Sequence, residues 1–179
     1  MPASRPRECG TFPAGPARPA HLFSVTLMGR SATVGSAPSA GRPASTLVMA
    51  ADILLIATPI WLGHPSSICQ RVLERLNAEL SETDDEGRLL TYNKVAAVAV
   101  VGNEDGAHKV SADVFQGLND IGFSLAPGAV TYWVGEAQQG TDYQDLQETP
   151  DAVKATTRAL AVNGVHLARR LADHPYPSS

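Results

Sequence analysis

The stretch from Ala51 to Leu80 constrains the fold most, because three different patterns follow one another within it. It opens with an unbroken apolar run at residues 52–57, which is typical of a strand buried on both faces in a parallel sheet. A loop with two prolines, one glycine and one tryptophan follows, from Thr58 to Ser67. An amphipathic stretch then begins, with Ser66 or Ser67 as its expected N-cap. We therefore expect a strand, a ligand loop and a helix in that order.

Strand and helix patterns alternate along the rest of the chain. Residues 91–101 and 129–134 are expected strands, and residues 110–121 and 150–172 are expected helices. Because strand and helix patterns alternate, the economical architecture is a series of βαβ units with right-handed crossovers. The sequence therefore predicts an α/β fold with a parallel sheet.

The first 47 residues differ in composition from the remainder. They hold seven of the thirteen prolines, five arginines, no lysine and one acidic residue, so their net charge is +4 while the remainder carries −8. This shift marks a boundary, and the lack of apolar periodicity predicts a mostly disordered basic segment in which residues 21–28 are the only plausible strand. An organelle transit peptide, or a beginning that is not the native start of the domain, stays open. We expect an atypical segment 1–47, a folded domain 48–172 and a tail 173–179.

Length, charge and cysteine content limit the classes of protein. A chain of 179 residues suits one domain, and no apolar run approaches the roughly 20 residues of a membrane span. The formal net charge of −4 argues against a general nucleic-acid binder. Cys9 and Cys69 lie far apart and form no CxxC pair, so we expect neither a disulfide scaffold nor a zinc site, and a reducing, cytoplasmic location.

Two loops follow successive expected strands and carry the residues best suited to a ligand. In the first loop, Trp61 and Leu62 offer a flat apolar surface, while Gly63 and the start of the next helix offer backbone N–H donors. The second loop, Gly102 to His108, has two glycines that let the backbone approach a ligand, and Asn103 can donate and accept hydrogen bonds. Because neighbouring parallel strands end at the same edge of a sheet, the two loops are expected to share one crevice.

Plainer interpretations stay open for the same residues. Trp61 is equally well explained as a core side chain under a loop, and the acids of the second loop as a solvated turn. No nucleophile elbow, P-loop or Rossmann motif is present, and no spacing resembles a metal-ligand set. A hydrolase that uses Ser66 or Ser67 with His64 or His108 is a weakly supported alternative.

The segment ADILLIATPIWLGHPSSICQRVLERLNAEL resembles the central strand, flavin loop and helix of the flavodoxin-like NADPH-dependent FMN reductase family. KVAAVAVVGNEDGAH is similar to that family's next strand and second flavin loop. The resemblance implies a flavodoxin-like three-layer sandwich with a parallel sheet, which binds FMN non-covalently and takes NADPH as co-substrate. Carried over by position, the cofactor-binding residues are Thr58, Pro59, Ile60, Trp61, Leu62 and Gly63 in the first loop and Gly102, Asn103, Gly106 and Ala107 in the second.

The resemblance also implies that the flavin carries the redox chemistry, so no catalytic side chain is expected. Hydride would pass from NADPH to the flavin and on to free flavin, a quinone or another small-molecule acceptor. A homo-oligomer is implied, without nucleic-acid or membrane partners. The family begins with a strand and a Ser/Thr-rich loop for the FMN phosphate, whereas here residues 1–47 stand in that place. We therefore expect the first strand-helix unit to be lacking, the phosphate site to be missing or malformed and the activity to be impaired. The alternative is a flavin-free remnant of the fold that acts as a binding or structural protein.

Overall fold

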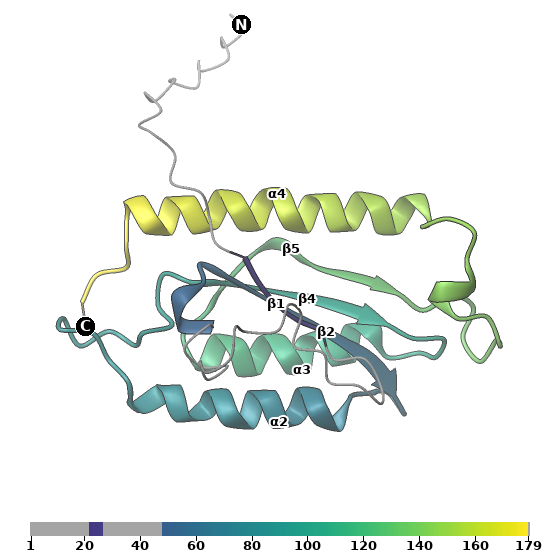
Figure 1. The fold of residues 1–179 in the computed structure, drawn as a ribbon, viewed down its shortest axis with the longest axis horizontal. Coiled ribbons are helices and arrows are strands. Elements are labelled where there is room, and N and C mark those ends of the chain that lie inside the picture. Colours follow the sequence, from purple (N-terminus) through teal and green to yellow (C-terminus); the bar gives the residue numbers. More distant parts are fainter. Residues whose placement is uncertain (1–21, 27–47, 179) are drawn as a thin grey trace, which may run out of the picture.

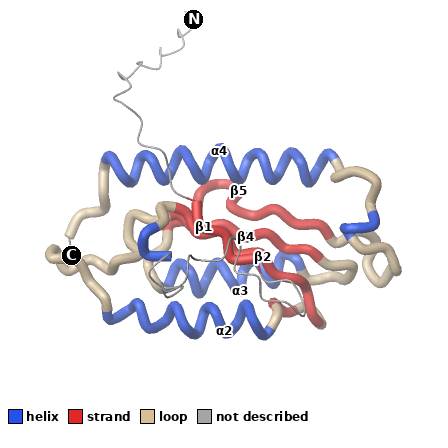
Figure 2. Tube along the Cα trace, in the orientation of Figure 1, coloured by secondary structure: helices blue, strands red, loops and turns tan. Residues whose placement is uncertain are grey.

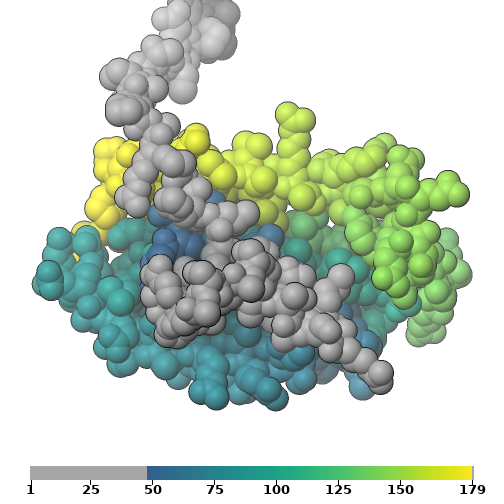
Figure 3. All heavy atoms as spheres, in the orientation of Figure 1, coloured from purple at the N-terminus to yellow at the C-terminus, as the bar shows by residue number. Residues whose placement is uncertain are grey.

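The computed structural model describes residues 22–26 and 48–178 of the chain. In chain order its elements are β1 (Leu22–Thr26), β2 (Ile53–Trp61), β3 (His64–Pro65), α2 (Ser67–Leu76), η1 (Asn77–Ser81), β4 (Val95–Val101), α3 (Ala107–Asp120), β5 (Ser124–Trp133), η2 (Tyr143–Asp145) and α4 (Asp151–Asp173). The sheet lies between two helical layers, with α4 along one face and α2 and α3 against the other (Figure 1). Figure 3 shows the same division on the surface, with α4 in yellow-green above and α2 in blue-teal below.

The sheet has the order β1-β2-β4-β5, and each neighbouring pair on this path is parallel (Figure 2). The short strand β3 pairs with β2 in the antiparallel sense. Because the main strands are parallel, their carboxyl ends lie at one edge of the sheet and their amino ends at the opposite edge. This arrangement confirms the predicted α/β sandwich and places the loops after β2, β4 and β5 at the same edge.

β1 corrects one half of the expectation that the first strand-helix unit is lacking, because the strand is present. It falls within residues 21–28, where the sequence has its only plausible early strand, and it pairs in parallel with residues 53–57 of β2. A strand is therefore present within the segment 1–47. Residues 27–47, where the remainder of that unit and the phosphate loop were sought, lie outside the described residues.

β2 is longer than the sequence predicts, because Pro59 lies inside it rather than in a loop. The carbonyl of Asp52 accepts a hydrogen bond from the Val95 amide on β4. Since alternate residues of a strand address the same neighbour, Pro59 faces the other side, towards β1. β1 ends at Thr26, opposite Ala57, so the missing N–H of the proline costs no sheet hydrogen bond among the described residues.

β5 also begins earlier than predicted, at Ser124 instead of Ala129. Its register against β4 jumps after Ala96, which pairs with Leu125, whereas Val98 pairs with Val130. The residues between form a bulge that accommodates a proline and a glycine, which is a usual place for both in a strand.

The helices match the predicted pattern with small shifts. Ser66 is the N-cap of α2, as one of the two expected candidates, but α2 ends at Leu76 and continues as η1 instead of reaching Leu80 as α-helix. Gly122, with a φ of 98°, follows α3, as the sequence predicts. Among the described residues, none of the helices has both the length and the apolarity that a membrane crossing requires.

The apolar core occupies both faces of β2 and β4. The larger cluster lies against α2 and α3 and includes Ile56, Val98 and Phe123, each at most 1% exposed. A smaller cluster on the α4 face joins Ile53 to Leu171 and their neighbours. The strands at the centre of the sheet are thus held from both sides, and the loops at their carboxyl ends extend from a rigid base.

Candidate functional site

The first loop is a β-hairpin. β2 continues to Trp61, and β3 returns beside it with Trp61 opposite His64. Leu62 and Gly63 form the two-residue turn with positive φ angles of 50° and 72°, the pattern of a type I′ hairpin turn. Glycine adopts this conformation freely, whereas a left-handed conformation costs a leucine about 1–2 kcal/mol. Local strain is therefore concentrated at the hairpin tip.

The hairpin tip presents apolar surface to its surroundings. Trp61 is 57% exposed and Leu62 is 90% exposed. A methyl group added to Gly63 would meet no atom within 4 Å, so the backbone there is open to close approach. The interpretation of Trp61 as a core side chain is therefore wrong, and the tip has the apolar surface that a planar ring requires.

The inner side of the same segment is buried and serves the fold. Thr58 Oγ1 accepts a hydrogen bond of 3.1 Å from the Ser66 amide, and Ser66 Oγ accepts one of 3.1 Å from the Cys69 amide at the start of α2. Burial raises the pKa of the Cys69 thiol to about 11, although its hydrogen bond to Thr58 opposes the shift. Ser66 thus caps a helix, and within the described part of the chain no histidine is bonded to it, so the hydrolase alternative gains no support.

The second loop lies directly against the hairpin. The Leu62 amide donates a hydrogen bond of 3.0 Å to Glu104 Oε1. A Cβ on Gly106, whose φ is 126°, would lie 2.9 Å from the Cα of Gly63, so only glycine allows the two backbones to approach this closely. Lys109 Nζ lies 3.1 Å from His64 Nδ1. These contacts bring together the two loops that the sequence predicts to share a crevice.

The remaining predicted residues of the second loop lie at different depths. A Cβ on Gly102 would come within 3.1–3.2 Å of the Ile60 side chain, so this glycine allows close packing under the hairpin. Ala107 is 5% exposed and belongs to the core. Three of the predicted residues therefore lie beneath the hairpin tip: Ile60, Gly102 and Ala107. Gly106 lies where the second loop touches the hairpin.

The N-terminus of α3 opens onto the same edge. Its N-cap is Gly106, which has no side chain to cap the first turn. The first N–H groups of a helix have no partners within the helix and carry partial positive charge, so they bind electron-rich oxygen and nitrogen atoms. A ligand with a planar apolar body and a polar rim matches this combination of exposed apolar tip and helix N-terminus.

A third loop, residues 134–150, completes the site, and none of the predicted cofactor-binding residues lies in it. The Gly102 amide donates to the Trp133 carbonyl at 3.0 Å, and the Gln138 amide donates to the Asn103 carbonyl at 2.7 Å. Asn103 Nδ2 also donates to Asp142 Oδ1 at 3.1 Å. Asn103 therefore ties the second loop to the third. The signal available in the sequence was the length of the polar segment 135–150, because long loops in compact domains are usually functional.

Aromatic residues at the end of β5 and in η2 line the carboxyl edge of the sheet beside the third loop. Trp133 packs on Tyr143 with ring centroids 5.5 Å apart, beside a cavity of about 260 Å³ between the sheet and α4. His108 Nε2 lies 3.1 Å from the Tyr132 hydroxyl. His108 is exposed and has the Tyr132 hydroxyl as a protein partner. The described residues contain no group of three or more His, Cys, Asp or Glu side chains placed to hold a metal ion.

A comparison with protein families decides which kind of chain this is. The family described as NADPH-dependent FMN reductase matches residues 19–139. The chain belongs to this family. The match begins before β1 and extends into the third loop, so it covers the strand within segment 1–47 as well as both predicted ligand loops.

Individual relatives agree with this membership. The chain is 39% identical over 127 residues to 8-demethyl-8-aminoriboflavin-5'-phosphate synthase of Streptomyces davaonensis. The matched residues make up 70% of this chain and 49% of that protein. It is 34% identical over 127 residues to a Mycobacterium bovis protein named as the divalent metal cation transporter MntH, but only 19% of that protein is covered. The chain thus spans about half or less of these relatives.

A solved structure supports the fold. The crystal structure of RosB with the bound intermediate 8-demethyl-8-formylriboflavin-5'-phosphate matches with a TM-score of 0.68 and 38% identity, over 74% of this chain and 53% of that chain. The flavodoxin-like fold class predicted from the sequence is therefore confirmed.

Proposed function

We propose that this protein is an FMN-binding oxidoreductase whose ring site is the edge formed by the hairpin tip and the second loop. The observation that carries the proposal is the exposed tip Trp61-Leu62-Gly63, held against Gly106 beside the N-terminus of α3. Large apolar side chains on a surface mark binding sites when they gather in one patch. In a member of the NADPH-dependent FMN reductase family, a flavin ring is the ligand that this patch suits.

The ten predicted cofactor-binding residues divide into two groups under this proposal. Direct ring contacts come from Trp61, Leu62 and Gly63, with Asn103 and Gly106 at the border of the ring. The other five hold these residues in place from beneath: Thr58, Pro59, Ile60, Gly102 and Ala107. Thr58 and Ile60, at 3% exposure each, and Ala107, at 5%, have no free surface for a ligand. Gly102 packs against the Ile60 side chain and Pro59 lies inside β2.

The described residues fit the flavin ring. The residues expected to bind the FMN phosphate fall within 27–47, outside the described part of the chain. The tip supplies apolar area, and the first turn of α3 supplies N–H donors for the polar rim. When bound, FMN supplies the hydride chemistry, with NADPH as co-substrate and a quinone, free flavin or similar small molecule as acceptor. The protein orients the ring against the apolar hairpin tip Trp61-Leu62-Gly63 and beside the N-terminus of α3.

A missing or malformed phosphate site stays a prediction, because residues 27–47 lie outside the described residues. Each lost charge-assisted hydrogen bond to the phosphate weakens binding by about 1.5–3 kcal/mol. We therefore propose that FMN binds more weakly here than in a protein with a complete phosphate loop, and that activity is impaired in proportion. We further propose that the protein is cytoplasmic and forms homo-oligomers, as the family resemblance implies.

A second function at the same site has specific support. The relative of known structure holds a derivative of riboflavin 5'-phosphate that is described as an intermediate, so flavin is chemically changed by that protein. The ring site would then take a flavin phosphate as substrate instead of as a retained cofactor. Both functions need the same wall, and they differ in whether the flavin leaves unchanged.

Turnover of NADPH with recovery of the flavin separates these functions. The purified protein is incubated with FMN, NADPH and a quinone; NADPH absorbance is followed, and the flavin is then recovered by chromatography. NADPH oxidation that needs both FMN and protein, with FMN recovered intact, supports the oxidoreductase. A changed flavin supports the second function. A colourless protein that takes up no added FMN contradicts both and leaves the flavin-free remnant.

A further inference from the structure

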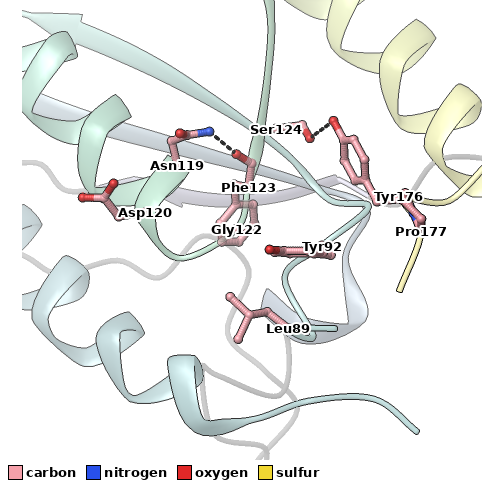
Figure 4. A pocket seen from close by; sticks show the side chains of 9 residues that line it. All are labelled: Leu89, Tyr92, Asn119, Asp120, Gly122, Phe123, Ser124, Tyr176 and Pro177. Atoms are coloured by element: carbon pink, nitrogen blue, oxygen red, sulfur yellow. Dashed lines mark hydrogen bonds between the residues drawn. The ribbon is translucent and has the colours of Figure 1, made fainter. Parts of the chain in front are cut away.

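A second cavity lies at the opposite edge of the sheet from the loops. It has a volume of about 370 Å³ and is formed by the end of α3, the start of β5, the segment before β4 and the tail after α4 (Figure 4). This volume is within the range of about 300–1,000 Å³ that small-molecule sites occupy. Nothing in the flavin proposal uses this cavity.

Backbone donors around the cavity are already taken by the protein. The amides of Tyr92, Gly122, Phe123 and Ser124 donate to the carbonyls of neighbouring residues at 2.9–3.0 Å. The amide of Tyr176 donates to Asn93 Oδ1 at 2.7 Å. An anion, which binds by accepting such donors, therefore finds few partners here.

Acceptors and negative charge remain available instead. Asn119 Nδ2 donates to the Phe123 carbonyl at 3.1 Å, which fixes the amide so that its Oδ1 is left without a partner among the described residues. Asp120 stands at the rim, in the last turn of α3, where no basic residue balances the partial negative charge of the helix end. Its Oδ1 accepts a hydrogen bond of 2.7 Å from Gln116 Nε2, and the carboxylate keeps its negative charge. The lining contains no lysine, arginine or histidine. The nearby Arg88 is neutralised by ion pairs to Asp84 at 2.8 Å and Glu86 at 3.0 Å.

Two tyrosines give the cavity aromatic walls. The rings of Tyr92 and Tyr176 are in edge-to-face contact, with centroids 6.2 Å apart and planes at 71°, and both line the cavity. Gly122 makes this possible, since a Cβ there would lie 2.7 Å from the Tyr92 ring. Tyr176 is held in place at its carbonyl by Arg88 at 3.1 Å and at its hydroxyl by Ser124 at 2.9 Å. A tyrosine ring that lines a cavity attracts organic cations through the negative face of the ring.

We propose that this cavity is a binding site for a small organic cation of the alkylammonium class. The tyrosine rings face its positive charge, while Asn119 Oδ1, the end of α3 and Asp120 supply the acceptors and the negative potential. The tail residue Tyr176 is then a ligand-binding residue as well as the anchor that holds the tail to the domain. The proposal concerns the amino end of the sheet only, so it stands or falls independently of flavin binding.

The experiment uses choline and 3,3-dimethyl-1-butanol, which has the same shape but no charge. Each is titrated into the ¹⁵N-labelled protein, and the amide shifts of Gly122 and Ser124 are followed. We expect choline to give saturable shifts and the neutral compound to bind at least about tenfold more weakly, because only the cation gains from the ring faces. No choline shifts, or equal binding of the two compounds, would overturn the proposal.

Variants assign the effect to the aromatic wall. Tyr176→Phe keeps the ring and should bind choline within about twofold of the wild type, whereas Tyr176→Leu keeps an apolar side chain and should lose about tenfold. Tyr143→Leu, which changes a tyrosine at the other edge of the sheet, is the matched control and should leave choline affinity unchanged. Circular dichroism verifies that each variant is folded. Unchanged choline affinity in folded Tyr176→Leu would contradict the role of the ring and with it the proposal.

Discussion

The two ends of α3 offer opposite chemistry, and both open onto an edge of the sheet. At its N-terminus, Gly106 leaves the first turn without a side-chain cap, beside the exposed tip Trp61-Leu62. At its C-terminus, the donors of the adjoining turn are satisfied within the protein, and acceptors remain next to two tyrosine rings. One edge therefore suits a planar, electron-rich ligand and the other suits a cation. The difference shows that the polarity of a site follows from which backbone groups the fold leaves unpaired, as much as from its charged residues.

The largest effect is expected at the contact between the hairpin and the second loop. Gly106→Ala places a Cβ within 2.9 Å of the Gly63 Cα and forces alanine to a φ of 126°. We expect a loss of about 1–3 kcal/mol in the free energy of unfolding, because a non-glycine residue is strained there, together with loss of FMN binding. Urea unfolding and FMN fluorescence titration measure the two effects.

Gly140→Ala is the matched control for that substitution. Gly140 lies in the third loop, and a Cβ there would meet no atom within 4 Å. Its stability should remain within about 0.5 kcal/mol of the wild type, as for surface substitutions in general. Equal effects of the two substitutions would show that the close approach of the loops is unimportant.

The next largest effect separates the exposed tip from the fold. Trp61→Ala should weaken FMN binding by about 0.5–1.5 kcal/mol or more, since an aromatic contact with the ring is lost. Stability should change little, because the side chain is 57% exposed. Val162→Ala, which removes a 59% exposed apolar side chain on α4, serves as control and should leave FMN affinity unchanged. Identical FMN affinity in the wild type and Trp61→Ala would refute the role of the tip.

Cys69 on α2 tests whether the apolar core between the two edges of the sheet is closed to water. Burial raises the pKa of its thiol from the usual value of 9.0 to about 11. The folded state thus holds the proton more tightly than the unfolded state, so this contribution to stability is complete below pH 9 and is lost as the pH rises towards 11. By pH 10 the wild type should lose about 1 kcal/mol more than Cys69→Ala, relative to pH 7. Parallel stability curves for the two proteins would show that the thiol is accessible.

The smallest effect concerns the link from Glu104 to the Leu62 amide. Glu104→Ala removes the acceptor of this 3.0 Å hydrogen bond and should cost about 0.5–1.5 kcal/mol in stability, with a modest loss of FMN affinity. Glu104→Gln keeps an oxygen at the same place and should recover most of both. If alanine and glutamine behave alike, the hydrogen bond does not hold the hairpin tip.

Much of the fold was predictable because the strongest signals are local. Apolar runs placed β2 and β4, helical periodicity placed α2, α3 and α4, and a serine before α2 predicted its N-cap. The errors arose where pairing partners decide the outcome. Pro59 is accommodated because β1 ends opposite Ala57 and β3 pairs with β2 only from Ile60 onwards, and Pro127 because β5 forms a bulge. A sequence pattern does not reveal either circumstance.

The site was predictable in its location but not in its depth. The two loops were expected at one edge, and the contacts of Gly63 with Gly106 and of Leu62 with Glu104 show them together. The sequence gives no way to tell that Ile60 points inwards and Trp61 outwards unless the strand is known to continue through Pro59. The third loop and the amino-end cavity depend on contacts between residues far apart in the chain, such as Asn103 with Asp142.

The central claim is that flavin binds at the carboxyl edge of the sheet, and amide shifts during an FMN titration test it most directly. The account predicts saturable shifts at Gly63 and Gly106 and at the first turn of α3, with Gly122 at the other end unchanged. Absence of any shift, or shifts confined to Gly122 and the tail, would contradict it.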